Sequence, residues 1–155
     1  MLVAQLNQEP IRVGLLGAGT VGSQTARLLV EQKDELAARI GRPIELAGVA
    51  CLDPDEVNFP WIDKSLLTTD TMSVATNADI VVELIGGTTV ARTFVMAAIE
   101  SGASVVTANK ALLAKYGPEI YAAPTPRAST STSRPRSAAR SRSYCRCASR
   151  WPATR

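Results

Sequence analysis

Three glycines at the spacing Gly17-x-Gly19-x-x-Gly22 are the residues whose type and spacing point most directly to chemistry. A residue without a Cβ atom permits a tight turn at Gly17, close approach of the backbone to a pyrophosphate at Gly19, and close packing at Gly22. A helix that begins directly after such a turn presents free backbone N–H groups to phosphates. The spacing predicts a dinucleotide-binding turn; the alternative is a glycine turn between two core elements.

The segments on either side of the glycines supply the strand and the helix that such a turn needs. An apolar run predicts a strand over Ile11–Leu16. A helical spacing of apolar residues begins at Thr20 or Val21 and continues to about Arg39 as one long helix. Gly41, with a proline two residues later, is a typical helix end.

A carboxyl group and a pair of glycines mark the end of a second apolar segment. Ile80–Ile85 has the composition of a buried parallel strand and contains Glu83. Because a buried carboxyl group is costly unless it is paired or hydrogen-bonded, Glu83 either faces a cofactor cleft or pairs structurally. Gly86 and Gly87 follow directly, and they either let the backbone approach a nicotinamide ring or form a plain turn.

Lys110 follows a third predicted strand, Ser104–Thr107, and is the candidate for proton chemistry. Ligands of open α/β sheets bind at the carboxyl ends of the strands, where its ammonium group could meet an anionic substrate or assist proton transfer. A plain surface lysine is the alternative. The chain contains no His, which excludes His-based acid–base catalysis and Ser-His-Asp triads.

Strands and helices alternate along the chain from Ile11 to Tyr121. This alternation predicts an α/β fold with a doubly wound, Rossmann-like parallel sheet. Residues 53–70 are expected to form a loop-rich connection. The other expected elements are a strand at Ile44–Ala50, helices at Thr71–Ala75 and Val90–Glu100, and a helix at Ala111–Tyr121 that is interrupted or kinked near Gly117 and Pro118.

The end of the second predicted strand should approach the adenosine ribose. An acidic residue there accepts hydrogen bonds from the ribose hydroxyls of NAD, whereas an arginine holds the 2′-phosphate of NADP. This chain has Cys51 at that point, and Asp53 is the best acidic candidate. Because Pro54 follows it, Asp53 could equally be a turn residue, and the choice between NAD and NADP stays open.

Composition narrows the class of protein. The chain has 155 residues, 46% of them hydrophobic, which fits one domain with a core. No apolar run reaches the ~18 residues of a membrane span, and residues 1–10 form a leader without the features of a secretory signal. Three cysteines are too few for a disulfide framework, so we expect a cytoplasmic protein, and no metal site is predicted.

Charge divides the chain at about residue 123. Residues 1–123 hold nine basic and fourteen acidic residues, a net charge of −5, whereas residues 124–155 hold eight arginines and no acidic residue. The second segment is rich in Pro, Ser, Thr and Arg, a composition that cannot build a core, and we expect a disordered basic tail. The expected domains are therefore a leader at 1–10, a nucleotide-binding domain at 11–123 and a tail at 124–155.

Three motifs together resemble homoserine dehydrogenase. They read G-L-L-G-A-G-T-V-G at Gly14–Gly22, D-I-V-V-E-L-I-G-G at Asp79–Gly87 and V-V-T-A-N-K-A-L-L-A at Val105–Ala114. The third is the most specific, since generic Rossmann proteins lack it. The resemblance covers residues ~11–121.

The resemblance implies NAD(P)-dependent interconversion of aspartate semialdehyde and homoserine, a step of threonine and methionine biosynthesis. It implies a homodimer for the whole protein and gives no role to a membrane. Lys110 would act in substrate handling or proton relay. The cofactor, NADP or NAD, would contact Gly17, Ala18, Gly19, Thr20, Val21, Gly22, Gly86, Gly87, Thr107, Asn109 and Lys110. Family members that use NADP often have an Arg just after the second strand, where this chain has Cys51.

The segment after Ala123 departs from the family, which continues into a catalytic and dimerisation domain. A shifted reading frame is our hypothesis, because suitable codons for residues 133–144, read one base earlier, give F-E-A-A-V-G-G-A-I-P-I-L, which resembles the start of that domain. We then expect this chain alone to have little turnover. The alternative is a stand-alone nucleotide-binding module with a nucleic-acid-binding tail, which the scarcity of aromatic residues in the tail disfavours.

Overall fold

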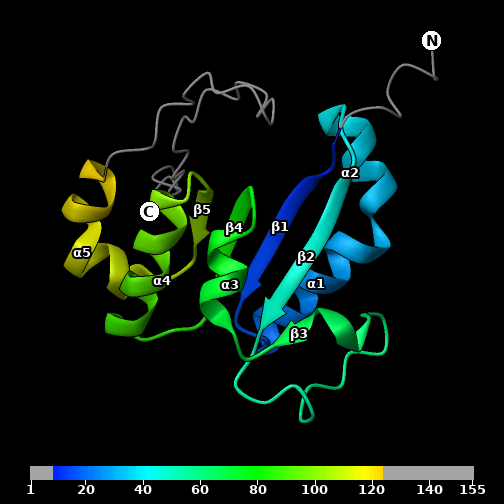
Figure 1. Ribbon diagram of the computed structural model, residues 1–155, viewed down its shortest axis with the longest axis horizontal. Helices are drawn as coiled ribbons and strands as arrows, with labels where there is room; N and C mark the ends of the chain where they lie inside the picture. Colours follow the sequence, from blue (N-terminus) through cyan, green and yellow to red (C-terminus); the bar gives the residue numbers. More distant parts are fainter. Residues whose placement is uncertain (1–8, 124–155) are drawn as a thin grey trace, which may run out of the picture.

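The computed structural model describes residues 9–123 (Figure 1). The predicted tail and most of the predicted leader lie outside these residues. The strands are β1 (Ile11–Leu16), β2 (Ile44–Ala50), β3 (Leu67–Thr68), β4 (Ile80–Glu83) and β5 (Ser104–Thr107). The helices are α1 (Thr20–Glu31), α2 (Lys33–Ile40), the 3₁₀ turn η2 (Lys64–Leu66), α3 (Thr71–Thr76), α4 (Thr89–Glu100) and α5 (Lys110–Ala122).

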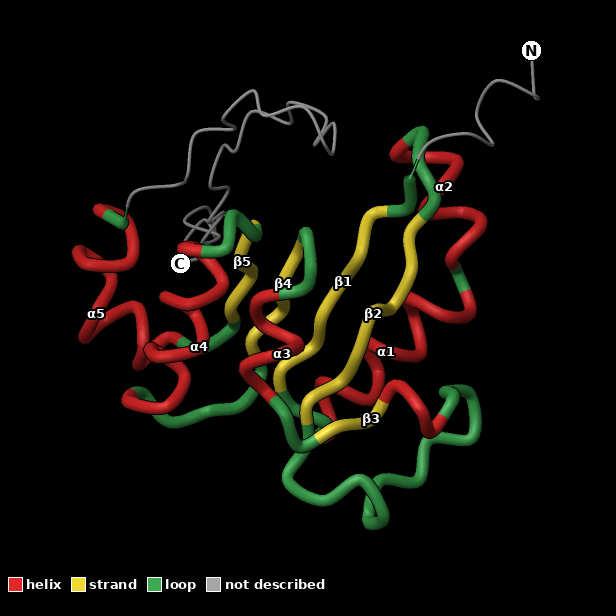
Figure 2. The backbone as a smooth tube through the Cα atoms, in the orientation of Figure 1, coloured by secondary structure: helices red, strands yellow, loops and turns green. Residues whose placement is uncertain are grey.

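The five strands form one sheet in the order β3-β2-β1-β4-β5, and each neighbouring pair is parallel (Figure 2). The chain runs from β1 outward to β3 and then crosses back to β4 on the other side of β1. The order of strands therefore reverses between β1 and β4, which is where open α/β sheets bind ligands, at the carboxyl ends of the strands. The predicted doubly wound parallel sheet is confirmed.

Alternate side chains of β1 enter different cores on the two faces of the sheet. Val13 and Leu15 pack in a core with Ala26 of α1, whereas Leu16 packs with Val74 of α3 and Ala98 of α4. Helix α1 therefore covers one face and helices α3 and α4 cover the other, as parallel strands with helical crossovers require. No helix within residues 9–123 is both long and apolar enough to span a membrane.

Glycine at position 14 of β1 permits close packing of α3. A Cβ atom built there would lie 2.9 Å from Val74 Cγ1 and 3.0 Å from the Val74 carbonyl oxygen. The neighbouring strand has Gly48 in register with Gly14, and its Cβ would lie 3.3 Å from Val74 Cγ2. The short helix α3 thus sits against the backbone of the two central strands.

Two expectations about the first half of the domain were wrong. The single helix expected up to Arg39 is two helices, because the chain leaves helical geometry at Gln32, where φ is −107° and ψ is 18°. The connection over residues 53–70 is loop-rich as expected up to residue 63, but it ends in η2 and in the short strand β3, which the sequence did not predict and whose Leu67 and Thr68 pair with the end of β2. The interruption expected near Gly117 and Pro118 is absent, because α5 continues as one helix with Pro118 inside it.

Candidate dinucleotide site

The first predicted glycine makes the turn out of β1. Gly17 has a φ of 112°, a conformation that side-chain-bearing residues rarely adopt. Its N–H donates to the carbonyl of Ala50, the last residue of β2, at 2.9 Å. A Cβ atom at Gly17 would lie 2.8 Å from the carbonyl oxygen of Leu84. The turn is therefore enclosed by the ends of β2 and β4.

The other two glycines of the motif have opposite surroundings. A Cβ atom at Gly22 would lie 2.0 Å from the Gly17 carbonyl oxygen, so only glycine lets α1 start this close to the turn. A Cβ atom at Gly19 would meet no other part of residues 9–123 within 4 Å. Gly22 thus serves packing, as predicted, and the space in front of Gly19 is open to a ligand.

Helix α1 begins at this open space without a side-chain cap. Its N-cap residue is Gly19, and its first turn contains no acidic residue. The helices α2 and α4 also begin without a side-chain cap, whereas the carboxyl group of Asp70 caps α3 and the amide of Asn109 caps α5. The first N–H groups of a helix have no intrahelical partners, and together with the helix dipole they attract anions. The cradle formed by Gly17, Gly19 and Gly22 therefore fits a pyrophosphate.

The carboxyl group of Glu83 is fully buried and joins two strand ends. Its Oε1 accepts from the backbone N–H of Ile85 at 2.9 Å, and its Oε2 accepts from the Thr107 hydroxyl at 2.5 Å. Of the two roles left open by the sequence, the described contacts support structural pairing. Glu83 fixes the start of the loop after β4 to the end of β5.

The loop after β5 is held by a second set of hydrogen bonds. The Thr107 hydroxyl accepts from the Asn109 N–H at 3.0 Å. The side-chain Oδ1 of Asn109 accepts from the Leu112 N–H at 3.0 Å and thereby caps α5. The Asn109 side-chain amide also donates to the carbonyl of Gly87. Asn109 therefore connects the Gly86–Gly87 loop to the start of α5.

Gly86 and Gly87 both have positive φ, at 79° and 69°, and a Cβ atom at either would meet nothing within 4 Å in the part of the chain that the structure describes. The pair therefore forms a turn that needs glycine, and it also leaves its backbone open to a ligand. The two predicted roles of this glycine pair, a plain turn and an approach to a nicotinamide ring, are thus compatible in this fold.

Lys110 is exposed at the first position of α5, next to Asn109.

Strand register brings the two predicted halves of the site together. Leu16, at the end of β1, is in register with Glu83, and Glu83 is in register with Thr107. Two parts of the predicted site therefore leave the same edge of the sheet. One is the turn at Gly17 and Ala18 with the first residues of α1, Thr20 and Val21. The other is formed by the loops at Gly86, Gly87 and Asn109 with Lys110, the first residue of α5. Their contact with a cofactor stays a prediction. The hydrogen bond between Glu83 and Thr107 was not predicted from the sequence. Its only signal there was a carboxyl group in an apolar strand.

The end of β2 carries Cys51, whose thiol lies 3.7 Å from the Thr68 carbonyl oxygen. Burial raises the pKa of this thiol, and the nearby carboxylate of Asp53 acts in the same direction, against the lowering effect of the Thr68 hydrogen bond. Asp53 Oδ1 accepts from the Asp55 N–H at 2.9 Å, so this oxygen supports the turn that was one of the two predicted roles of Asp53. Among residues 9–123, no group of three or more His, Cys, Asp or Glu could hold a metal ion.

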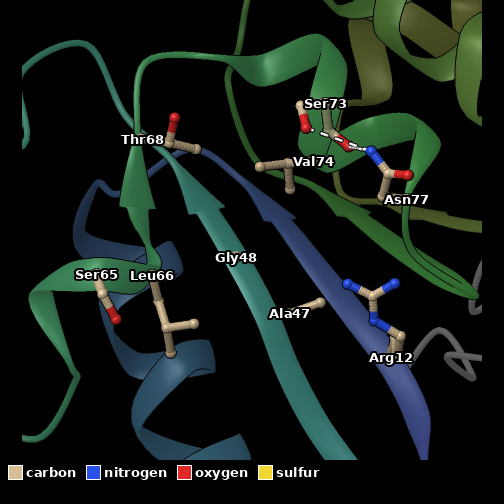
Figure 3. Close-up of a pocket in the computed structure, with 9 residues that line it drawn as sticks. All are labelled: Arg12, Ala47, Gly48, Ser65, Leu66, Thr68, Ser73, Val74 and Asn77. Carbon is tan, nitrogen blue, oxygen red and sulfur yellow. Dashed lines mark hydrogen bonds between the residues drawn. The ribbon is translucent and has the colours of Figure 1, made fainter.

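A separate groove of about 330 Å³ lies beside β2, between α3 and η2 (Figure 3). Ser73 and Val74 line it from α3, Thr68 from β3, and Arg12 from β1. The Arg12 guanidinium lies 3.5 Å from the carboxylate of Glu45. None of the predicted cofactor-binding residues lines this groove, so it is distinct from the cradle at the glycine turn.

Similarity to known proteins covers most of the chain. Residues 17–129 match the family model described as homoserine dehydrogenase, NAD binding domain. The homoserine dehydrogenase of Pseudomonas aeruginosa is 47% identical over 118 residues, which cover 74% of this chain and 26% of that protein. The chain thus spans about a quarter of the length of the curated relatives it matches.

Solved structures of homoserine dehydrogenases are also similar to this chain. The crystal structure of a homoserine dehydrogenase from Thiobacillus denitrificans is 47% identical, with a TM-score of 0.66 over 74% of this chain and 27% of that one. A hyperthermophilic archaeal homoserine dehydrogenase in complex with NADPH is 20% identical, with a TM-score of 0.55 over 73% of this chain and 40% of that one. At this lower identity the likeness shows the fold alone.

Proposed function

Because the chain belongs to the family of homoserine dehydrogenase NAD-binding domains, we propose that it binds NAD or NADP at its glycine turn for the interconversion of aspartate semialdehyde and homoserine. The observation that carries the proposal is the open cradle at Gly19 beside the uncapped start of α1. A pyrophosphate there would accept from backbone N–H groups and lie at the positive end of the helix dipole.

The second half of the proposed site is the nicotinamide end. A bound dinucleotide supplies the hydride that is exchanged with the substrate. The open backbone of Gly86 and Gly87 lets a flat ring approach the end of β4, and Asn109 holds that loop against α5. Lys110, exposed at the start of α5, is the proposed catalytic residue, whose ammonium group would bind the substrate or transfer a proton.

Further parts of the proposal concern the whole protein. We propose a role in threonine and methionine biosynthesis, a cytoplasmic location and a homodimer, and no role for a membrane or a nucleic acid. The nucleotide-binding domain is proposed to comprise residues 11–123, since β1 to α5 all lie within them. Relatives that are homoserine dehydrogenases favour this proposal over a stand-alone module with a nucleic-acid-binding tail.

The test is whether the full chain binds NADH and NADPH. Calorimetry and the fluorescence of the reduced nicotinamide measure this binding. We expect one of the two to bind, and ADP-ribose to compete for the same site. Lys110→Met should leave the binding of ADP-ribose unchanged, with Lys115→Met on the same helix as its control. A chain that folds but binds neither dinucleotide nor ADP-ribose would contradict the proposed cofactor role.

A further inference from the structure

The loop between β2 and η2, residues 51–63, leaves the sheet directly beside the glycine turn. The last residue of β2, Ala50, accepts the hydrogen bond from the Gly17 N–H, and the Cys51 N–H donates to Thr68 of β3 at 2.9 Å. In Figures 1 and 2 the loop extends beyond the carboxyl ends of β1 and β2. A dinucleotide whose pyrophosphate lies at Gly19 places its adenosine ribose at the end of the second strand. This loop is therefore the part of the chain that meets the ribose.

The loop is strongly acidic. Between Cys51 and Asp63 it contains four carboxyl groups and no lysine or arginine, and the four are Asp53, Asp55, Glu56 and Asp63. Asp53 is exposed and lies closest to the strand end in the sequence. One of its oxygens accepts from the Asp55 N–H. A carboxylate has acceptor sites left after one such bond, so Asp53 can also accept from a ribose hydroxyl.

The arginine that packs against this loop is already paired. The Arg27 guanidinium of α1 lies 5.3 Å from the ring centroid of Trp61 in the loop, and its Nε donates to Glu31 at 2.8 Å. Its charge is thus offset by a neighbouring carboxylate on the same helix. The side chain nearest the strand end after Cys51 is Leu52, which is apolar and fully exposed. Neither side chain offers the bidentate, unpaired guanidinium that a phosphate prefers.

The carboxylates of this loop favour the binding of one cofactor and oppose the binding of the other. A ribose 2′-hydroxyl is a hydrogen-bond donor to a carboxylate, whereas the 2′-phosphate of NADP brings about two negative charges to the same place. The proposal rests on the function proposed above. We infer that this site selects NAD(H) and rejects NADP(H), and that Asp53 and the acidic loop 51–63 are the specificity-determining elements.

The test compares the dissociation constants of NADH and NADPH for the full chain by calorimetry. At low ionic strength we expect NADPH to bind at least about tenfold more weakly than NADH. Because salt screens the repulsion between exposed charges, the ratio of the NADPH dissociation constant to the NADH dissociation constant should fall at about 1 M salt. NADPH binding as tightly as NADH at low salt would overturn the inference.

Two substitutions locate the selectivity. Asp53→Asn should weaken NADH binding and reduce the NADPH-to-NADH ratio of dissociation constants by about tenfold. Leu52→Arg adds a cation at a fully exposed position and should tighten NADPH binding by about tenfold. Glu100→Gln, at the other end of the sheet, removes one charge as a control and should leave the ratio unchanged. An unchanged ratio in both loop variants would overturn the role of this loop.

ADP-ribose separates failure of this inference from failure of the proposed function. If ADP-ribose and NADPH bind but NADH is not preferred, the dinucleotide site is real and its selectivity is not the one inferred here. If the folded chain binds none of the three, the proposed cofactor role fails, and the inference fails with it.

Discussion

Glu83 and Thr107 lie opposite each other on the adjacent parallel strands β4 and β5, and the Thr107 hydroxyl donates to the buried Glu83 carboxyl group at 2.5 Å. The same carboxyl group holds the Ile85 N–H, and the same hydroxyl accepts from the Asn109 N–H. One hydrogen-bonded pair therefore fixes both loops at the proposed nicotinamide end of the site. A buried network of this kind is rigid when every group in it has a partner.

Thr107→Val removes this hydroxyl at nearly constant volume. We expect the free energy of unfolding, measured by urea denaturation, to fall by about 1–3 kcal/mol, because the buried Glu83 oxygen loses its donor. NADH binding should weaken by about fivefold while ADP-ribose binding stays unchanged, since only NADH occupies the nicotinamide end. Thr93→Val, on the exposed surface of α4, is the control and should change neither quantity. Equal losses for both ligands would show that the pair supports the whole domain rather than the nicotinamide end.

Gly19→Ala and Gly22→Ala separate binding from folding within one motif. At Gly22 the new Cβ would lie 2.0 Å from a carbonyl oxygen, and we expect a loss of about 3 kcal/mol or more of stability. At Gly19 the Cβ enters open space, so stability should fall by at most about 1 kcal/mol, the cost of a poorer N-cap. Dinucleotide affinity of Gly19→Ala should nevertheless fall at least about tenfold, because the methyl group occupies the place of the pyrophosphate. Unchanged affinity would place the phosphates elsewhere.

Gly14→Ala should destabilise the domain by about 2 kcal/mol, because the Cβ would come within 2.9 Å of Val74 Cγ1. Gly48→Ala should cost less, since its nearest contact is 3.3 Å. In the double variant Gly14→Ala/Val74→Ala the loss should be about 1 kcal/mol smaller than the sum of the single losses, because the smaller side chain makes room. Additive losses in urea denaturation would contradict the close packing of α3 on β1.

The ion pair between Arg92 of α4 and Glu119 of α5 makes a pH-dependent contribution. Its hydrogen bond and charge lower the pKa of Glu119 below the ordinary value of 4.5. A lowered carboxyl pKa stabilises the fold above pH 4.5, and the contribution is lost as pH falls through the lowered value. Glu119→Gln should therefore melt at a slightly lower temperature than the unsubstituted chain at neutral pH and low salt. The difference should shrink as the pH falls below 4.5, because protonation of Glu119 removes its charge, and a difference that did not change with pH would exclude this cause.

Much of the fold could be predicted because its central strands are short apolar runs bounded by glycine, proline or polar residues. The predicted bounds of β1, β2 and β5 agree with the structure. The break between α1 and α2 could not be predicted, because the helical spacing of apolar residues continues across Gln32. Strand β3 was missed because two residues carry no periodic pattern, and it forms only where Leu67 and Thr68 pair with β2.

The sequence by itself determined the sheet class, the family resemblance and the glycine positions, since local spacing and backbone freedom specify them. Only the tertiary structure decided which glycine serves packing and which faces open space. This depends on the Gly17 carbonyl that would meet a Cβ atom at Gly22, and on the lack of such a contact for a Cβ atom at Gly19 within residues 9–123. It also decided that Glu83 pairs with Thr107, 24 residues away. Strand register sets such contacts, and register depends on how the helices pack on both faces of the sheet.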